Sequence, residues 1–532
     1  MIHIVNMIPA SLSGESHQDS EPNIAVNPEN TNDMVGTAFT PPPMGGTNAP
    51  IYVSTDGGNT WSLRTVVPGT DTTLNIGTHD ISVGFATTGG VLYAGILSGS
   101  NSHFQILRTS VFNSTTPMTV LVDRTSEDQP WVVASSVVVS GASKDRVFVG
   151  NEDGNQPGGK TATVDVSQDA ATAAAPAGFS PIQLERRSTA VIASLGRGKD
   201  GPPIRCAVHP DGTVYAAFHR WAPGQTFPNL SVDVTICRDD NWGASGTPFA
   251  ALVDSGDGVA GQRIATNQFV LFNAVMGQER LGGDLAIAVD PNNSSSVWVA
   301  WCNRVGGSGG TDWTLHVRHS TDRGQTWHND VRTITNAKNP GLAVNSNGVL
   351  ALLYQAFSGS TWDSKLELTS DSWGTAVTPL VLHSAPSTTP AVTFWPYIGD
   401  YVRIIAIGSS FFGVFCGNNT PNMANFPNGV TYQRNADWAG HRLLGTDGVT
   451  VVQPSIDPFF FHWSATIIPR GPIVGRGPIV TPSPIITRSP IISRGPIFPA
   501  PPQPPEPPAP INIGPTPVTK PGATNKPKDI KL

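Results

Sequence analysis

The chain has 532 residues, of which only 13% are charged, while Gly (55) and Pro (48) are both abundant. This composition is typical of many short strands joined by tight turns and leaves little material for helices. The net charge of −7, without a basic stripe interleaved with aromatic residues, argues against nucleic acid as the main partner.

The N-terminal segment, residues 2–8, lacks a basic region and is too short to be a secretory signal. The longest apolar stretch, residues 401–417, contains Arg403 and a break at Gly408, so it predicts two core strands around a turn rather than a membrane span. We expect a soluble protein without a membrane span, and an extracellular or surface location is favoured although no export signal is visible.

A repeated pattern follows: a polar or acidic residue, a short apolar run, a turn with Pro or Gly, then a second apolar run. Seven copies begin at Glu21, Asp80, Asp128, Arg205, Asp284, Asn339 and Tyr397. After most copies comes a second hairpin, as at residues 51–54 and 63–67. Two hairpins form one four-stranded antiparallel sheet, and the spacing is roughly that of a propeller blade. Residues 1–468 are therefore predicted to form an all-β β-propeller with seven four-stranded blades, six being the alternative.

Two features of the apolar segments support a ring of packed sheets. Residues 285–289 and 297–301 are nearly continuous apolar runs, as expected when both faces of a sheet are buried. A ring must also close to protect its edges, and either residues 2–8 or residues 459–468 could supply the closing strand. The four cysteines are far apart and lie in or beside apolar runs, which predicts buried thiols: Cys206, Cys237, Cys302 and Cys416.

Two octapeptides are nearly identical, STDGGNTW at 54–61 and STDRGQTW at 320–327. In each, we expect the aspartate to accept N–H bonds across a hairpin turn, a glycine to adopt positive φ and the tryptophan to pack between sheets. The structural residues are Ser54, Asp56, Gly58 and Trp61 in the first segment and Ser320, Asp322, Gly324 and Trp327 in the second. Degenerate copies stand at 238–243, 370–374 and 435–440.

This S-x-D-x-G-x-T-W pattern resembles the Asp-box, or BNR repeat, of the sialidase-like β-propellers, over about residues 21–468. The resemblance implies that the box is structural and lies on the blade periphery. It also implies, for catalytic members, three arginines that clamp a carboxylate, a Tyr–Glu nucleophile pair and an Asp acid/base. The first arginine normally lies near the N-terminus, whereas this chain has none before Arg64. This departure argues against exo-sialidase activity.

Aligning the repeat starts brings one residue of each blade to one mouth of the ring: Glu21, Asp80, Asp128, Arg205, Asp284, Asn339 and Asp400. Five of these seven are acidic, and carboxylates converging on a narrow channel need a cation, protonation or water. Two interpretations stay open. The carboxylates either bind Ca²⁺ or form a glycoside-hydrolase pair, or they cap strand ends and organise turns.

Asp400 is the most site-like member, because it lies between Tyr397 and Tyr401 and follows Phe394-Trp-Pro. Aromatic residues beside carboxylates are typical of sugar-binding sites, although a core role for them is the alternative. The candidate catalytic residues are Asp284, Asp400 and Tyr401. The candidate binding residues are Glu21, Asp80, Asp128, Arg205, Asn339 and Tyr397.

The composition changes at Pro469. Between residues 470 and 498, Pro recurs every six residues, followed by Ile and preceded in most copies by Arg two positions earlier. Six residues are two turns of polyproline II, so the repeat presents Arg, Pro and Ile on fixed edges of an extended rod. Residues 469–532 are predicted to be a Pro-rich tail, either a passive spacer or a strap whose residues 469–510 bind another protein or a second copy.

Two functions remain. The first is a carbohydrate-directed propeller with an acidic mouth, in which glycan binding is favoured over hydrolysis; as an enzyme it would be a glycoside hydrolase. The second is a non-catalytic structural or adhesion protein that its tail docks into a larger assembly.

Overall fold

The computed structural model describes residues 2–39, 48–68, 78–98, 103–172, 178–195, 204–224, 229–271, 285–306, 312–393 and 397–465. The chain divides into two units, Met1–Ile467 and Ile468–Leu532. All described residues belong to the first unit, so the predicted polyproline repeat lies outside them.

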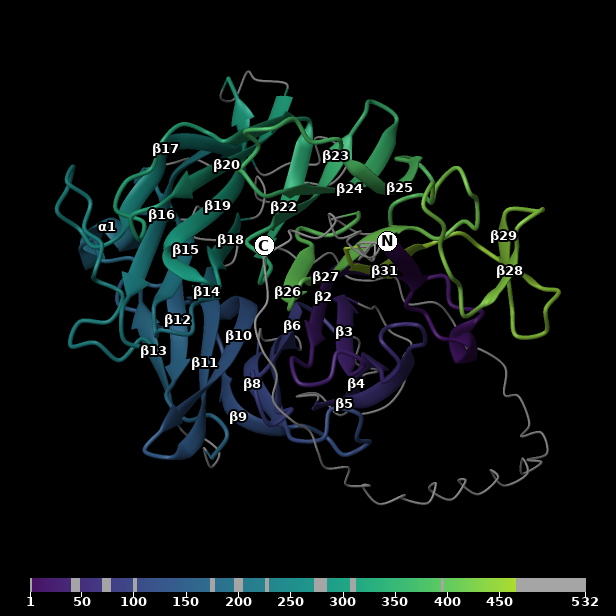
Figure 1. The fold of residues 1–532 in the computed structure, drawn as a ribbon, viewed down its shortest axis with the longest axis horizontal. Helices are drawn as coiled ribbons and strands as arrows, with labels where there is room; N and C mark the ends of the chain where they lie inside the picture. The colour runs from purple at the N-terminus through teal and green to yellow at the C-terminus, as the bar shows by residue number, and fades with distance from the viewer. Residues whose placement is uncertain are drawn as a thin grey trace, which may run out of the picture. The chain divides into compact units, whose positions relative to one another are not determined.

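The described residues form seven four-stranded antiparallel sheets and one three-stranded sheet (Figure 1). From the innermost strand outward, the first three sheets are β2 (Ser20–Val26), β3 (Met34–Phe39), β4 (Asn48–Ser54) and β5 (Ser62–Pro68); β6 (Ile81–Phe85), β7 (Leu92–Ser98), β8 (His103–Thr109) and β9 (Thr119–Arg124); and β10 (Glu127–Val139), β11 (Ala142–Asp153), β12 (Thr161–Ser167) and β13 (Phe179–Gln183).

The next three sheets are β14 (Arg205–Val208), β15 (Val214–Trp221), β16 (Asn229–Asp239) and β17 (Gln262–Leu271); β18 (Leu285–Asp290), β19 (Asn293–Val305), β20 (Asp312–Ser320) and β21 (Arg332–Thr335); and β22 (Ala337–Val344), β23 (Leu350–Phe357), β24 (Thr361–Thr369) and β25 (Leu380–Pro386). The seventh consists of β26 (Arg403–Ile407), β27 (Ser410–Asn418), β31 (Ile456–Trp463) and β1 (Ile2–Asn6). A 3-10 helix, η1 (Ala10–Leu12), and a short helix, α1 (Thr189–Ala193), complete the elements outside the sheets.

The seven sheets form a closed ring around one axis, as Figure 1 shows. Each innermost strand contacts the innermost strand of the next sheet, in the order β2, β6, β10, β14, β18, β22, β26 and back to β2. The predicted all-β propeller with seven four-stranded blades is confirmed.

Both candidate closing segments take part in the last sheet. β31 pairs with β27 as the third strand, and β1 pairs antiparallel with β31 as the fourth, with Ile2 opposite Trp463 and Asn6 opposite Phe459. Between β27 and β31 the chain inserts the three-stranded sheet of β28 (Asn435–Asp437), β29 (Arg442–Leu444) and β30 (Val451–Val452). The ring therefore closes by joining its first strand to its last.

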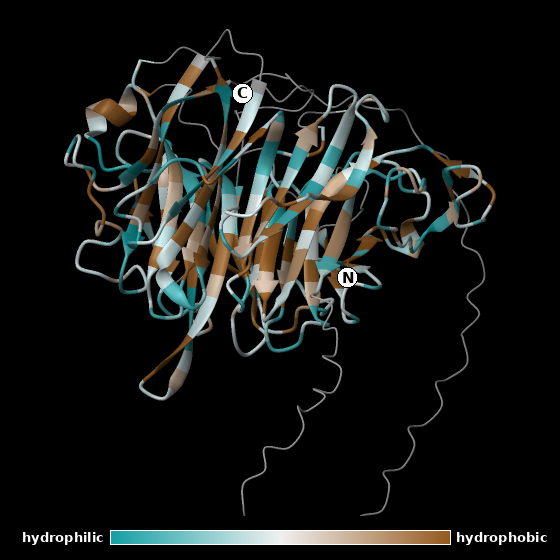
Figure 2. Ribbon diagram, turned by 45° about the horizontal axis from the view of Figure 1, so that its top comes forward, coloured by the Kyte–Doolittle hydropathy of each residue, from teal (hydrophilic) through white to brown (hydrophobic). Residues whose placement is uncertain are grey.

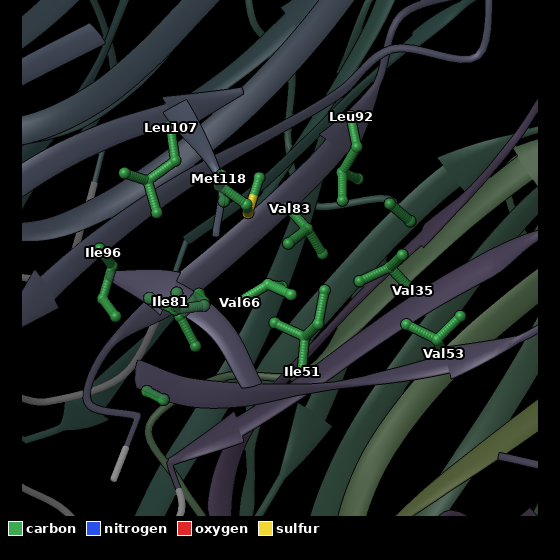
Figure 3. Close-up of a cluster of buried hydrophobic side chains, with 14 of the residues drawn as sticks. Val35, Ile51, Val53, Val66, Ile81, Val83, Leu92, Ile96, Leu107 and Met118 are labelled. Carbon is green, nitrogen blue, oxygen red and sulfur yellow. The ribbon is translucent and has the colours of Figure 1, made fainter. Parts of the chain in front are cut away.

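The core lies between neighbouring sheets. Figure 3 shows one such layer, in which Val35 and Ile51 of the first sheet pack with Ile81 and Val83 of the second, all fully buried. Since every sheet is covered on both faces, inner strands need apolar residues at consecutive positions. Figure 2 shows hydrophobic residues along the strands of the sheets in view. The four cysteines are free and buried, as predicted.

The two octapeptides form matching turns. Asp56 accepts hydrogen bonds from Ser54 Oγ at 2.8 Å, Thr60 Oγ1 at 2.6 Å and Thr60 N at 2.9 Å, and Asp322 accepts the same three bonds at the same distances in its own turn. Gly58 has φ +83°, and a Cβ there would lie 2.2 Å from Phe460 Cε1, so the turn requires glycine. No helix in the described ranges is long and apolar enough to cross a membrane.

Candidate ligand site at the propeller mouth

Tyr401 is the centre of a cluster that we call the Tyr401 mouth, made of Glu21, Asp80, Trp131, Arg205, Asp400 and Tyr401. Tyr401 precedes β26, and only 4% of it is exposed. Its ring packs edge-on against Trp131, with 5.5 Å between ring centroids, and the Arg205 guanidinium lies 5.4 Å from the Tyr401 centroid. These residues lie at or near the starts of the innermost strands of the third, fourth and seventh sheets, so the ring does bring distant strand starts together.

The charges at the Tyr401 mouth act on the tyrosine hydroxyl. Burial, followed by the charges of Asp80 and Glu21, raises the pKa of Tyr401 well above its usual value, while Arg205 opposes the shift and Asp400 adds to it. The phenol is therefore neutral at physiological pH and offers one donor and one acceptor.

Two other predicted residues lie differently. Asn339 is fully buried and donates from Nδ2 to Gly399 O at 2.9 Å and to Gln355 Oε1 at 2.7 Å, so it supports the backbone next to the mouth. Tyr397 is buried in an apolar cluster with Trp362 and donates from its hydroxyl to Pro390 O at 2.6 Å. Tyr397 therefore has the core role that the sequence left as the alternative. Asp284 lies outside the described residues, as does the segment 394–396.

Asp128 is one residue out of register with the other strand starts. Its carboxylate binds Lys160 Nζ at 2.8 Å instead of joining Tyr401. The innermost strands β2, β10 and β22 share a β-bulge at their start, at which Glu21, Gln129 and Asn339 adopt φ of 54°, 53° and 51°. Each of these three precedes a proline. The counterpart of Glu21 in the third sheet is thus Gln129, because the bulge adds one residue that an alignment of acidic positions does not show.

Trp131 and Arg403 belong to the same region and were not predicted as site residues. The Arg205 guanidinium lies 3.4 Å from the Trp131 ring centroid and the Arg403 guanidinium 4.4 Å from it. Such distances are those of cation–π contacts. The one signal in the sequence was the charge of Arg403 within an apolar run. Because the guanidinium groups of Arg205 and Arg403 cover the Trp131 ring, a sugar cannot stack on this ring in this conformation.

An axial channel of about 280 Å³ begins at these two arginines. The innermost strands β10, β14, β18, β22 and β26 line it, with Trp131, Arg205 and Arg403 at the strand starts and mainly apolar side chains beyond them. Arg205 is buried, whereas Val208, Val289 and Ala406 at the strand ends are half-buried. The channel therefore opens on the face opposite the Tyr401 mouth.

A metal at the mouth stays a prediction. Within the described ranges, no group of three or more His, Cys, Asp or Glu side chains is placed to hold a metal ion. The Ca²⁺ interpretation had included Asp284, which is not among those residues.

The fold is that of a β-propeller, a ring of seven four-stranded sheets. No protein-family model and no curated protein matches the sequence. Solved structures with a similar fold include the GH93 α-L-arabinofuranosidase of Fusarium graminearum in complex with arabinobiose (11% identity, 66% of this chain and 92% of that chain, TM-score 0.38). They also include a protein of unknown function from Dyadobacter fermentans (9% identity, 87% of this chain and 98% of that chain, TM-score 0.41). A third is the Hadza microbial sialidase Hz136 (13% identity, 76% of this chain and 64% of that chain, TM-score 0.35). The fold assignment rests on the sheets described above, and the named activities are those of the other proteins.

Proposed function

We propose that this propeller binds a hydroxyl-rich glycan at the Tyr401 mouth. The observation that supports this proposal is the gathering of three carboxylates, a guanidinium and a neutral phenol at the starts of innermost strands from four different sheets. Carboxylates accept hydrogen bonds from neighbouring sugar hydroxyls, and guanidinium and phenol groups donate to sugar oxygens. A few convergent polar groups in a protected site are typical of small-ligand binding.

Binding is favoured over hydrolysis by the protonation of Tyr401. A tyrosine nucleophile needs a phenol that loses its proton readily, whereas burial, Asp80 and Glu21 raise the pKa of Tyr401. Since the Trp131 ring is covered by guanidinium groups, the ligand would be held by hydrogen bonds rather than by stacking. Asp284 and Asp400 remain the candidate acid and base if the protein does cleave its ligand.

A glycan array followed by calorimetric titration tests this proposal. We expect one class of glycan to bind, and Asp400→Asn to weaken it at least tenfold, because a charged acceptor contributes about 1.5–3 kcal/mol. Asp437→Asn, which alters a carboxylate in the inserted sheet, is the matched control and should bind as the natural chain does. Release of reducing sugar that Asp284→Asn or Asp400→Asn abolishes would show hydrolysis as well. Failure of all glycans to bind would overturn the proposal.

The second candidate function is a structural or adhesion role. Large apolar side chains are exposed on or beside the inserted sheet of β28–β30, with Val449 77%, Val451 46% and Trp438 38% accessible. Large exposed apolar side chains are available for contact with a partner. Light scattering of the full chain and of a chain ending at residue 468, with circular dichroism to check folding, tests this role. Association that requires the tail supports it, and identical monomers in both samples contradict it.

A further inference from the structure

The axial channel contains Arg403, a half-buried cation without a counter-charge among the described residues. Arg403 Nη2 donates to Val132 O at 3.2 Å, whereas Nη1 is buried without a hydrogen-bond partner. Among the described residues, no carboxylate forms an ion pair with Arg403. A guanidinium has five N–H donors, and leaving a buried N–H group without an acceptor is costly.

Arg205 adds a second positive charge at the same place. The two guanidinium groups lie 3.4 Å and 4.4 Å from the centroid of the Trp131 ring. Burial, followed by repulsion from Arg205, lowers the pKa of Arg403 to about 9. An anion at this end of the channel would offset both the burial of Arg403 and its repulsion by Arg205, because the anion supplies the opposite charge and accepts a hydrogen bond from Arg403 Nη1.

The remainder of the channel suits an apolar chain. Beyond the arginines its wall is formed by side chains such as Val208, Ala288, Val344 and Ala406, which offer no hydrogen bonds. One water-sized group occupies about 30 Å³, so a channel of about 280 Å³ holds about nine non-hydrogen atoms. An occupant therefore has a short apolar tail and one anionic end.

We propose that the axial channel binds an unbranched carboxylate of about six to eight carbons in all. The carboxylate pairs with Arg403 beside Arg205, and the tail runs along the innermost strands toward the face opposite the Tyr401 mouth. The two proposed sites share Arg205 and Trp131, but Asp400 belongs only to the Tyr401 mouth and Arg403 only to the channel, so variants of these two residues test the sites separately.

Calorimetric titration with octanoate tests the proposal. We expect saturable binding of one octanoate per chain, with acetate, which lacks the tail, and 1-octanol, which lacks the charge, each at least tenfold weaker. Arg403→Met should weaken octanoate at least tenfold and leave 1-octanol unchanged. Arg146→Met is the matched control, because Arg146 lies on the neighbouring strand β11 and binds Gln168 O. This control should bind octanoate as the natural chain does.

A second variant covers the case in which Arg403→Met does not fold. Ala406→Leu fills the open end of the channel and keeps both arginines, so it should weaken octanoate but not acetate. Asp400→Asn should leave octanoate binding unchanged, which separates this site from the glycan site. The proposal fails if octanoate shows no saturable binding, if acetate or 1-octanol binds equally well, or if Arg403→Met and Ala406→Leu both retain octanoate.

Discussion

Replacing Arg434 by Met removes one half of a buried ion pair that joins the two ends of the ring. Arg434 and Asp457 are in direct contact, and both side chains are inaccessible to solvent. Asp457, on β31, also accepts from Asn6 Nδ2 at 2.7 Å, which ties it to β1. Arg434 donates in addition to Glu15 O at 3.0 Å. Removing the guanidinium thus leaves a buried carboxylate without its counter-charge at the point of closure.

Breaking a buried ion pair at one partner costs about 3–5 kcal/mol. Asp457 would keep neutral donors in Asn6, Asn419 and Ser455, so we expect the lower end of this range. The entropy of unfolding is about 2.1 cal/mol/K per residue, or about 1 kcal/mol/K for roughly 460 residues. A loss of about 3 kcal/mol therefore lowers the Tm by about 3 °C, which differential scanning calorimetry resolves.

Two further variants make this prediction specific. Arg442→Met breaks the exposed pair with Asp437, in which Arg442 is 52% accessible, and should leave the Tm unchanged. Adding Asp457→Asn to Arg434→Met removes the uncompensated charge, so part of the lost stability should return. The reasoning would be refuted if Arg434→Met lowered the Tm no more than Arg442→Met, or if the second change lowered it further.

Three other predictions concern the sheets and their turns. Burial lowers the pKa of His219 to about 3, whereas the unfolded chain protonates this histidine below about pH 6.5, so the free energy of unfolding decreases as the pH is lowered. At pH 4 this loss is about 3 kcal/mol, and His219→Phe should avoid it, as measured by urea denaturation. Asp322→Ala should cost about 1 kcal/mol by the same assay without changing glycan affinity, since its bonds stay within one turn. Burial raises the pKa of Cys206 and Cys237 to about 12, so a thiol reagent should label none of the four cysteines until the protein unfolds.

The sequence was sufficient to predict the sheets but not how the ring closes. Apolar runs at a regular spacing indicate seven blades because each blade buries both faces and must repeat the same pattern. Residues 2–6 and 459–463 are both apolar strands, and pattern alone does not say which edge each one meets. The structure uses both, because the last sheet takes three strands, β26, β27 and β31, from the C-terminal part of the ring and its fourth, β1, from the N-terminal end. Pairing across 450 residues depends on tertiary contacts that have no local signal.

The candidate site was predicted in part, and the error has a structural cause. The repeat alignment places Glu21, Asp80, Arg205 and Asp400 at one opening, and in the structure the charges of all four reach Tyr401. Asp128 does not, since a bulge shifts the strand start by one residue and makes Gln129 the counterpart of Glu21. The sequence contains a signal for this register, because Glu21, Gln129 and Asn339 are each followed by proline. Aligning the prolines, rather than the acidic residues, gives the correct register.

The shared backbone of these strand starts determines how the mouth should respond to mutation. A positive φ at a non-glycine residue costs about 1–3 kcal/mol and persists only when its surroundings hold it. Asn339 is held by its bond to Gly399 O, and Gly399 lies so close to Glu21 that a Cβ on it would be 2.5 Å from Glu21 N. The Asn339 amide and the main chain of Gly399 and Glu21 therefore link the first, sixth and seventh sheets at the mouth. These contacts do not involve the Asp400 carboxylate. Asp400→Asn should consequently change ligand contacts while the strand starts keep their conformation, whereas Asn339→Ala should alter the mouth itself.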